Sequence, residues 1–229
     1  MKKITAILAA LVLAISLGAQ DNKWTPEDII NTEYAGNISF SPDNTMVVWA
    51  KRKASKEKDK FVSDIYLTRL NVMKDGMPLT VQLTTGDEND TSPLFSKDGE
   101  TIYFQSSRKE GKRLWSLSIY GGEPQEVAEF KNGISNMQWL NDSTFAFISN
   151  EGETLYDTQI KEKKDNVEVV EDTVHWKPNR VYSYNLKDKS TQRLTANPYQ
   201  VDNYRAARDG QWLVYRVIGS PHYGIDANP

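Results

Sequence analysis

The chain has 229 residues, of which 38% are hydrophobic and 26% are charged, and its formal net charge is −3. This composition is typical of a folded globular protein and excludes a disordered chain. Lys+Arg and Asp+Glu are nearly balanced at 28 and 31, so no charge excess indicates nucleic acid or a membrane surface as a partner. Cysteine is absent, so no disulfide can form and the fold must be stabilised by its core alone.

The first 19 residues are predicted to be a signal peptide. Lys2 and Lys3 precede an apolar run over residues 4–17, and small residues follow at Gly18 and Ala19. The run is shorter than the ~20 residues that span a bilayer, which favours cleavage after Gly18 or Ala19 over a retained anchor. We therefore expect a periplasmic or secreted protein that is free of the membrane after cleavage. Residues 20–34 are interpreted as a lead-in segment.

Four copies of a strand–turn–strand pattern follow the lead-in segment. Asp beside Gly or Asn in such a turn tolerates the positive φ of a tight hairpin. In the first three copies a large aromatic residue precedes the turn, and we expect Phe40, Phe95 and Trp139 to be buried at equivalent positions. The fourth copy has only Ala206 there. The turn aspartates are identified as Asp43, Asp98, Asp142 and Asp209.

Each of the first three turns is followed by two further predicted strands, so the repeating unit is four antiparallel strands. The turn aspartates lie 55, 44 and 67 residues apart, whereas a blade without insertions takes about 40–50 residues. The first and third units therefore need inserted loops. We place them at residues 51–60, a solvated charged extension of a hairpin, and at residues 150–178.

The predicted fold is all-β: a partial β-propeller of about three and a half four-stranded antiparallel blades, preceded by the signal peptide. The propeller covers residues 35–229, with blades at about 35–84, 85–130 and 131–195 and an incomplete blade at 196–229. Such sheets bury their faces by stacking around an axis, and propellers have four to eight blades. A partial ring leaves faces and strand edges open, which indicates a longer parent protein or self-association through open sheet edges.

The sequence shows no pattern of a hydrolytic or metal site. A nucleophile elbow reads G-x-S-x-G, but the string at residues 133–137 has Met137 in place of the second glycine. The two histidines, His175 and His222, cannot complete a Ser–Asp–His order. The acidic run at residues 87–90 lacks the glycine of an EF-type loop and is interpreted as an inter-blade connection. We therefore predict no catalytic residue, no cofactor and no metal within this chain.

The strings FSPDNTMVVWA, SDIYLTRL and RLWSLSIYGGEPQEVA resemble the N-terminal propeller of the prolyl oligopeptidase family of serine peptidases. The acylaminoacyl-peptidase and broad-specificity dipeptidyl-peptidase branch is the most similar, and the resemblance covers about residues 24–215. It implies a propeller, typically seven-bladed, that caps an α/β-hydrolase domain and restricts the access of peptides. The D-W-x-x-E-E motif of the proline-specific branch is not present.

Dipeptidyl peptidases of this family hold the free amine of a peptide with acidic propeller residues. On that resemblance Glu168, Glu171 and Asp172, in the second inserted loop, are candidate substrate-binding residues, because carboxylates pair with ammonium groups. The alternative is a solvated acidic loop. The predicted function is the non-catalytic propeller portion of an exported serine exopeptidase, gating peptide access to a hydrolase domain that this chain lacks. The alternative function is a periplasmic propeller that binds or scaffolds without peptidase activity.

Overall fold

The computed structural model describes residues 24–152, 158–159, 162–163, 177–196 and 199–219. The chain divides into two units, residues 1–32 and residues 33–229. The predicted signal peptide lies outside the described residues. Among the residues that are described, no helix is long and apolar enough to cross a membrane.

The described part of the first unit is a single short helix, α2 (Pro26–Ile30). Its start is specified by a reciprocal cap. The Thr25 hydroxyl accepts a hydrogen bond from the Asp28 backbone N–H at 3.1 Å, and the Asp28 carboxylate accepts one from the Thr25 backbone N–H at 2.9 Å. Pro26 occupies the first turn, where its missing N–H costs no helical hydrogen bond.

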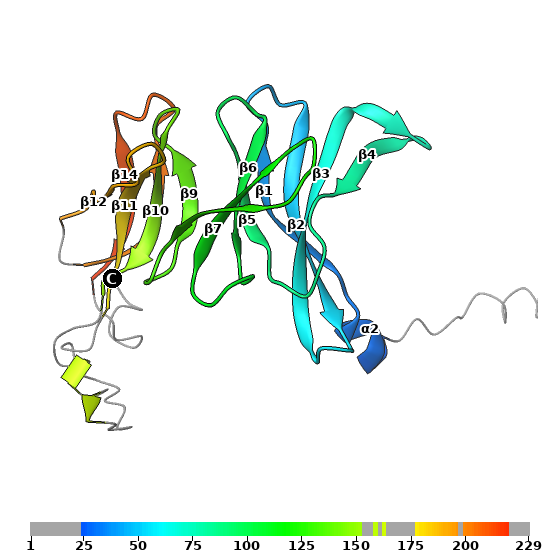
Figure 1. Cartoon of the computed structure of the whole chain (residues 1–229), viewed down its shortest axis with the longest axis horizontal. Helices are drawn as coiled ribbons and strands as arrows, with labels where there is room; N and C mark the ends of the chain where they lie inside the picture. Colours follow the sequence, from blue (N-terminus) through cyan, green and yellow to red (C-terminus); the bar gives the residue numbers. More distant parts are fainter. Residues whose placement is uncertain (1–23, 153–157, 160–161, 164–176, 197–198, 220–229) are drawn as a thin grey trace, which may run out of the picture. The chain divides into compact units, whose positions relative to one another are not determined.

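The described residues of the second unit form three four-stranded antiparallel sheets and one two-stranded sheet (Figure 1). Each sheet is formed by strands that are consecutive in the chain, as a propeller blade requires. This confirms the predicted all-β class and the four-stranded antiparallel blades. Blade 1 contains β1 (Tyr34–Phe40), β2 (Met46–Ser55), β3 (Lys60–Lys74) and β4 (Met77–Gln82); blade 2 contains β5 (Thr91–Phe95), β6 (Thr101–Ser106), β7 (Arg113–Ser118) and β8 (Gln125–Glu129); blade 3 contains β9 (Ser135–Trp139), β10 (Thr144–Asn150), β11 (Asn179–Asn185) and β12 (Thr191–Arg193); the fourth, incomplete blade contains β13 (Gln200–Ala206) and β14 (Leu213–Ile218).

The hydrophobic core lies between successive blades. Ile65 of blade 1 and Phe104 of blade 2 belong to the first cluster, and both are fully buried. Phe147 of blade 3 packs in the second cluster with Leu114 of blade 2. Val201 of the fourth blade belongs to a third cluster with strands β10 and β11. Alternating apolar residues along the strands thus face the neighbouring sheet, which is how each blade buries a face that it cannot bury alone.

The expectation that three aromatic residues are buried at equivalent positions is confirmed for one, holds in part for a second and is wrong for the third. Phe95 is 2% exposed and packs against blade 1. Trp139 is partly buried, and its Nε1 donates to the Phe95 carbonyl oxygen at 2.5 Å. Phe40, however, is 58% exposed. Side chains at this position are covered by the preceding blade, and no blade precedes β1 among the described residues.

The turns between the first two strands of each blade repeat a side-chain-to-backbone bond, with one departure from the predicted alignment. Asp43, Asp98 and Asp209 each accept a hydrogen bond from the backbone N–H two residues later. In blade 3 the acceptor is Asn141 and not Asp142, the residue that the sequence aligns with the other three turn aspartates. In blades 1, 2 and 4 the residues that pair across this turn are seven positions apart: 40 with 47, 95 with 102, and 206 with 213. In blade 3 they are six positions apart, 139 with 145. The third turn is shorter, which shifts the acceptor towards the start of the turn.

The first of these turns is expected to lose stability in acid. The Ser41 hydroxyl, the Thr45 backbone N–H and the Thr45 hydroxyl all donate to the Asp43 carboxylate and lower its pKa from 3.8 to about 2. Because the folded pKa is depressed, this contribution is present above about pH 4 and is lost as the pH falls towards 2. Asp43→Asn should therefore flatten the decline of the urea unfolding midpoint over this range. Asp142→Asn is the matched control, and an equal flattening by both would contradict the assignment.

The charged run at residues 51–60 forms a hairpin extension, as the sequence indicates, but most of it is strand. β2 continues to Ser55 and β3 begins at Lys60, which leaves a turn at residues 56–59. Several of its lysines are paired with acids. Lys51 lies 2.5 Å from Glu33, Lys53 lies 3.3 Å from Asp64, and Lys58 lies 2.8 Å from Asp87.

Candidate functional site

The acidic residues that the sequence singles out for substrate binding, Glu168, Glu171 and Asp172, lie outside the described residues, as do His175 and His222. The ends of the inserted loop that carries the three acidic residues and His175 are described. The loop leaves β10 after Asn150 and returns at β11, which begins with Asn179. These two asparagines are linked by a side-chain hydrogen bond of 2.8 Å.

The serine of the incomplete elbow string has an ordinary structural environment. Ser135 stands at the start of β9, and its hydroxyl donates to the Ile148 carbonyl oxygen of the neighbouring strand at 3.3 Å. Within the described part of the chain, no group of three or more His, Cys, Asp or Glu side chains could hold a metal ion.

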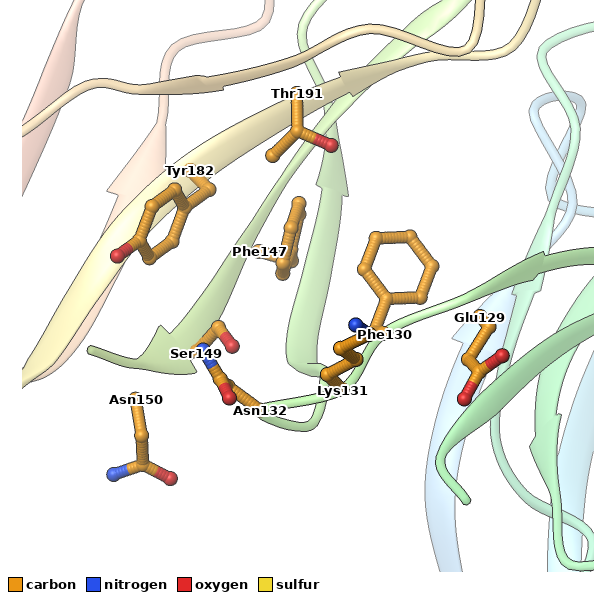
Figure 2. Close-up of a pocket in the computed structure, with 9 residues that line it drawn as sticks. All are labelled: Glu129, Phe130, Lys131, Asn132, Phe147, Ser149, Asn150, Tyr182 and Thr191. Carbon is orange, nitrogen blue, oxygen red and sulfur yellow. The ribbon is translucent and has the colours of Figure 1, made fainter. Parts of the chain in front are cut away.

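A small cavity of about 210 Å³ opens between blades 2 and 3 (Figure 2). Three aromatic rings line it. The Phe147 ring centroid lies 4.9 Å from that of Phe130 and 5.8 Å from that of Tyr182. The polar residues of its wall are Glu129, Lys131, Asn132, Ser149, Asn150 and Thr191.

Much of that polar wall is engaged within the protein. The Ser149 hydroxyl donates to the Gly133 carbonyl oxygen at 2.7 Å, and Glu129 pairs with Arg113 at 3.1 Å. Sites for drug-sized ligands enclose about 300–1,000 Å³ and place polar groups so that they converge on the ligand. The cavity is smaller than that and has room for one apolar side chain or a fragment of similar size.

A buried charge network joins blades 1 and 2. The Asp90 side chain is almost fully buried, and its Oδ2 lies 2.5 Å from Nη2 of Arg108. Asp64, equally buried, lies 3.3 Å from Nζ of Lys53. Burial raises the pKa of Asp64, and the hydrogen bond and charge of Lys53 oppose that shift. The Asp90 backbone N–H donates to the Ser63 carbonyl oxygen at 2.8 Å, which fixes the inter-blade connection against β3.

Sequence reasoning missed this network. The sequence interpretation takes the acidic run at residues 87–90 as a solvated connection, and Asp87 is indeed exposed while Glu88 is partly exposed. Asp90 is buried because the chain brings Arg108, from the next hairpin, against it. No local signal distinguishes Asp90 from its neighbours, since its partner is remote in the sequence.

A second network stands at the corresponding place in blade 3. Arg180, whose side chain is 4% exposed, contacts Glu151 at 3.1 Å and donates to the Tyr199 carbonyl oxygen at 2.5 Å. Arg193 lies 2.5 Å from the same glutamate. In a four-stranded antiparallel blade, the loop between the second and third strands and the connection to the next blade emerge at the same end. Each network includes a residue from the loop between the second and third strands and a residue from the connection to the next blade. Charged groups therefore gather at that end of the blades.

The stacked four-stranded antiparallel sheets define a β-propeller protein. Acylaminoacyl peptidase from Pyrococcus horikoshii shares this fold with a TM-score of 0.56 and 16% identity, over 85% of this chain and 29% of that chain. No family model matches the sequence.

Two curated proteins are similar in sequence. An uncharacterized peptidase, YuxL from Bacillus subtilis, is 26% identical over 206 residues, which is 83% of this chain and 30% of YuxL. Dipeptidyl-peptidase 5 from Porphyromonas endodontalis is 25% identical over 154 residues, which is 62% of this chain and 22% of that enzyme. The chain thus resembles the N-terminal propeller of prolyl oligopeptidase-family serine peptidases, and it spans less than a third of the length of either relative.

Proposed function

We propose that the chain is the non-catalytic N-terminal propeller portion of an exported serine exopeptidase and gates the access of peptides to a hydrolase domain. The observation that carries the proposal is the match of a four-stranded blade repeat to a minor part of two peptidases. A segment of such a protein without a Ser–Asp–His arrangement would control the access of peptides and bind them, and would not itself cleave a bond.

The charged end of the blades supports a role towards peptides. The inserted loop with Glu168, Glu171 and Asp172 leaves and re-enters blade 3 at the end where the Arg180–Glu151 pair stands. Carboxylates presented there would pair with the free amine of a peptide by charge-assisted hydrogen bonds. We propose these three residues as the amine-binding group of the propeller.

The first expected result is an absence of activity. The 229-residue chain should not hydrolyse peptide or ester substrates, and a fluorophosphonate probe should not label it, because Ser135 is bonded to a strand carbonyl rather than activated by a base. Intact-mass measurement after probe treatment is the test. Stoichiometric labelling of any serine would show that the chain itself is a hydrolase.

The reading frame downstream of these residues separates the proposal from its alternative. Continuation into further blades and a G-x-S-x-G domain, together with labelling of that serine in the longer protein, is the expected outcome. A stop codon directly after residue 229 would leave a periplasmic propeller that binds or scaffolds without peptidase activity.

A further inference from the structure

The cavity between blades 2 and 3 has an aromatic floor. Phe147 lies between the other two rings, with the plane of Tyr182 at 27° to its own and the plane of Phe130 at 70° (Figure 2). The three rings come from separate segments, since Phe130 belongs to the connection between the blades, Phe147 to β10 and Tyr182 to β11. Rings in these two orientations suit a further aromatic ring, which can stack on one and meet another edge to face.

The equivalent position between blades 1 and 2 carries a larger ring. Trp115 of β7 pairs with Phe104 of β6. Tyr182 of β11 pairs with Phe147 of β10 in the same register, so Tyr182 and Trp115 are structural equivalents. Trp115 is only 8% exposed and packs in the cluster shared with blade 1. The fold thus accommodates more aromatic area at this position, and in blade 3 the residue is the smaller tyrosine.

Two polar side chains at the rim of the cavity have their hydrogen-bonding groups available for a ligand. Lys131 and Asn132 are exposed, and within the described part of the chain their side chains make no hydrogen bond or ion pair. The Lys131 side chain points from the rim towards the rings (Figure 2). Glu129, an acidic residue of the wall, already pairs with Arg113 at 3.1 Å. An unpaired cation and an amide beside an aromatic floor are complementary to a ring that bears a negative charge.

A hydrogen-bonded turn fixes the segment that carries these two residues. The Phe130 backbone N–H donates to the Lys112 carbonyl oxygen of blade 2 at 2.7 Å, and the Gly133 backbone N–H donates to the Phe130 carbonyl oxygen at 2.9 Å. The Ser149 hydroxyl of blade 3 donates to the Gly133 carbonyl oxygen at 2.7 Å. Because the segment is bonded to both blades, the rim is preorganised and a ligand needs to order little of it.

We propose that this cavity is a binding site for a phenyl ring linked to a carboxylate, with the ring on the aromatic floor and the carboxylate paired with Lys131. The volume of about 210 Å³ suits one such ring with a short linker. Two sources share this chemistry: a free aryl-alkanoic acid and the C-terminal aromatic residue of a peptide. The inference does not rest on the proposed function, since neither the three proposed amine-binding carboxylates nor a hydrolase domain takes part in it.

Hydrocinnamate, a phenyl ring on a short acid, tests the site by NMR titration of the 229-residue chain. We expect a Kd on the order of 1 mM, with amide shifts concentrated in residues 129–133 and 147–150. Lys131→Gln should weaken binding about fivefold. Lys97→Gln is the matched control, because it removes an equally exposed lysine from a turn at the other end of blade 2. Hydrocinnamamide, the uncharged analogue, should bind equally to the parent chain and to Lys131→Gln.

Tyr182→Trp supplies the second measurement. It places in blade 3 the residue that blade 2 carries, and it should weaken hydrocinnamate binding about tenfold while circular dichroism stays unchanged. The Lys131→Gln comparison remains decisive if Tyr182→Trp does not fold.

N-acetyl-alanyl-phenylalanine separates the two sources of the ligand. Tighter binding than that of hydrocinnamate would identify the C-terminal residue of a peptide as the ligand, and binding that is no tighter would identify a free acid. Absence of amide shifts at about 10 mM hydrocinnamate, equal effects of Lys131→Gln and Lys97→Gln, or full affinity in a folded Tyr182→Trp would each overturn the proposal.

Discussion

Phe104→Ala is expected to lower the free energy of unfolding by about 3–5 kcal/mol. The Phe104 ring is fully buried on β6 and packs in the cluster that joins blades 1 and 2. Truncation removes its apolar contacts and leaves a cavity that two rigid sheets cannot close. Single domains have only about 5–15 kcal/mol of stability in total, so the variant should unfold at a clearly lower urea concentration.

Trp212→Ala is the matched control for Phe104→Ala, because it removes a larger ring that is 74% exposed. Its effect should stay within about 0.5 kcal/mol. Equal losses from the two variants would mean that the stability of the chain does not depend on the core between blades 1 and 2.

Gly210→Ala is expected to detach the fourth, incomplete blade from blade 3. A Cβ at Gly210 would lie 1.9 Å from the carbonyl oxygen of Leu140 and 2.7 Å from its carbonyl carbon, so backbone would have to move. The position also has φ +70, which costs an L-residue about 1–2 kcal/mol. Leu140 packs in the cluster that includes Val201 and Tyr204, so its displacement should open that cluster.

Amide hydrogen exchange measures this detachment directly. Protection should fall by about tenfold or more in β13 and β14, while β5–β8 keep theirs. Gly76→Ala serves as the control, because Gly76 has a similar φ of +79 but nothing within 4 Å of the added Cβ. If both variants lose protection in β13 and β14 to the same degree, the loss reflects lower stability of the whole chain rather than the Leu140 contact.

The periodic features of the fold could be predicted from the sequence because they depend on neighbours along the chain. The alternation of apolar residues in β6 and the Asp-Gly turn after Phe95 each specify local geometry, and together they predict four-stranded units. The resemblance to peptidase propellers rests on the same repeat. Asp142 shows the limit: a single-residue difference in turn length transfers the acceptor role to Asn141, and alignment of aspartates does not detect it.

The candidate site was less accessible to sequence reasoning. Asp90 and Arg180 are buried because partners from separate segments meet them, and composition alone describes both as ordinary charged residues. The proposed amine-binding residues, Glu168, Glu171 and Asp172, rest on sequence resemblance and on the placement of the loop ends.

By itself, the sequence determined that this protein is built from repeated antiparallel four-strand units, because strand alternation and turn chemistry act over a few residues. The tertiary structure alone decided which side chains of that repeat are buried. Phe40 and Phe95 occupy equivalent positions, yet one is exposed and the other is enclosed. The difference arises because burial at this position depends on whether another blade stands in front of the sheet, and a local pattern contains no information about that neighbour.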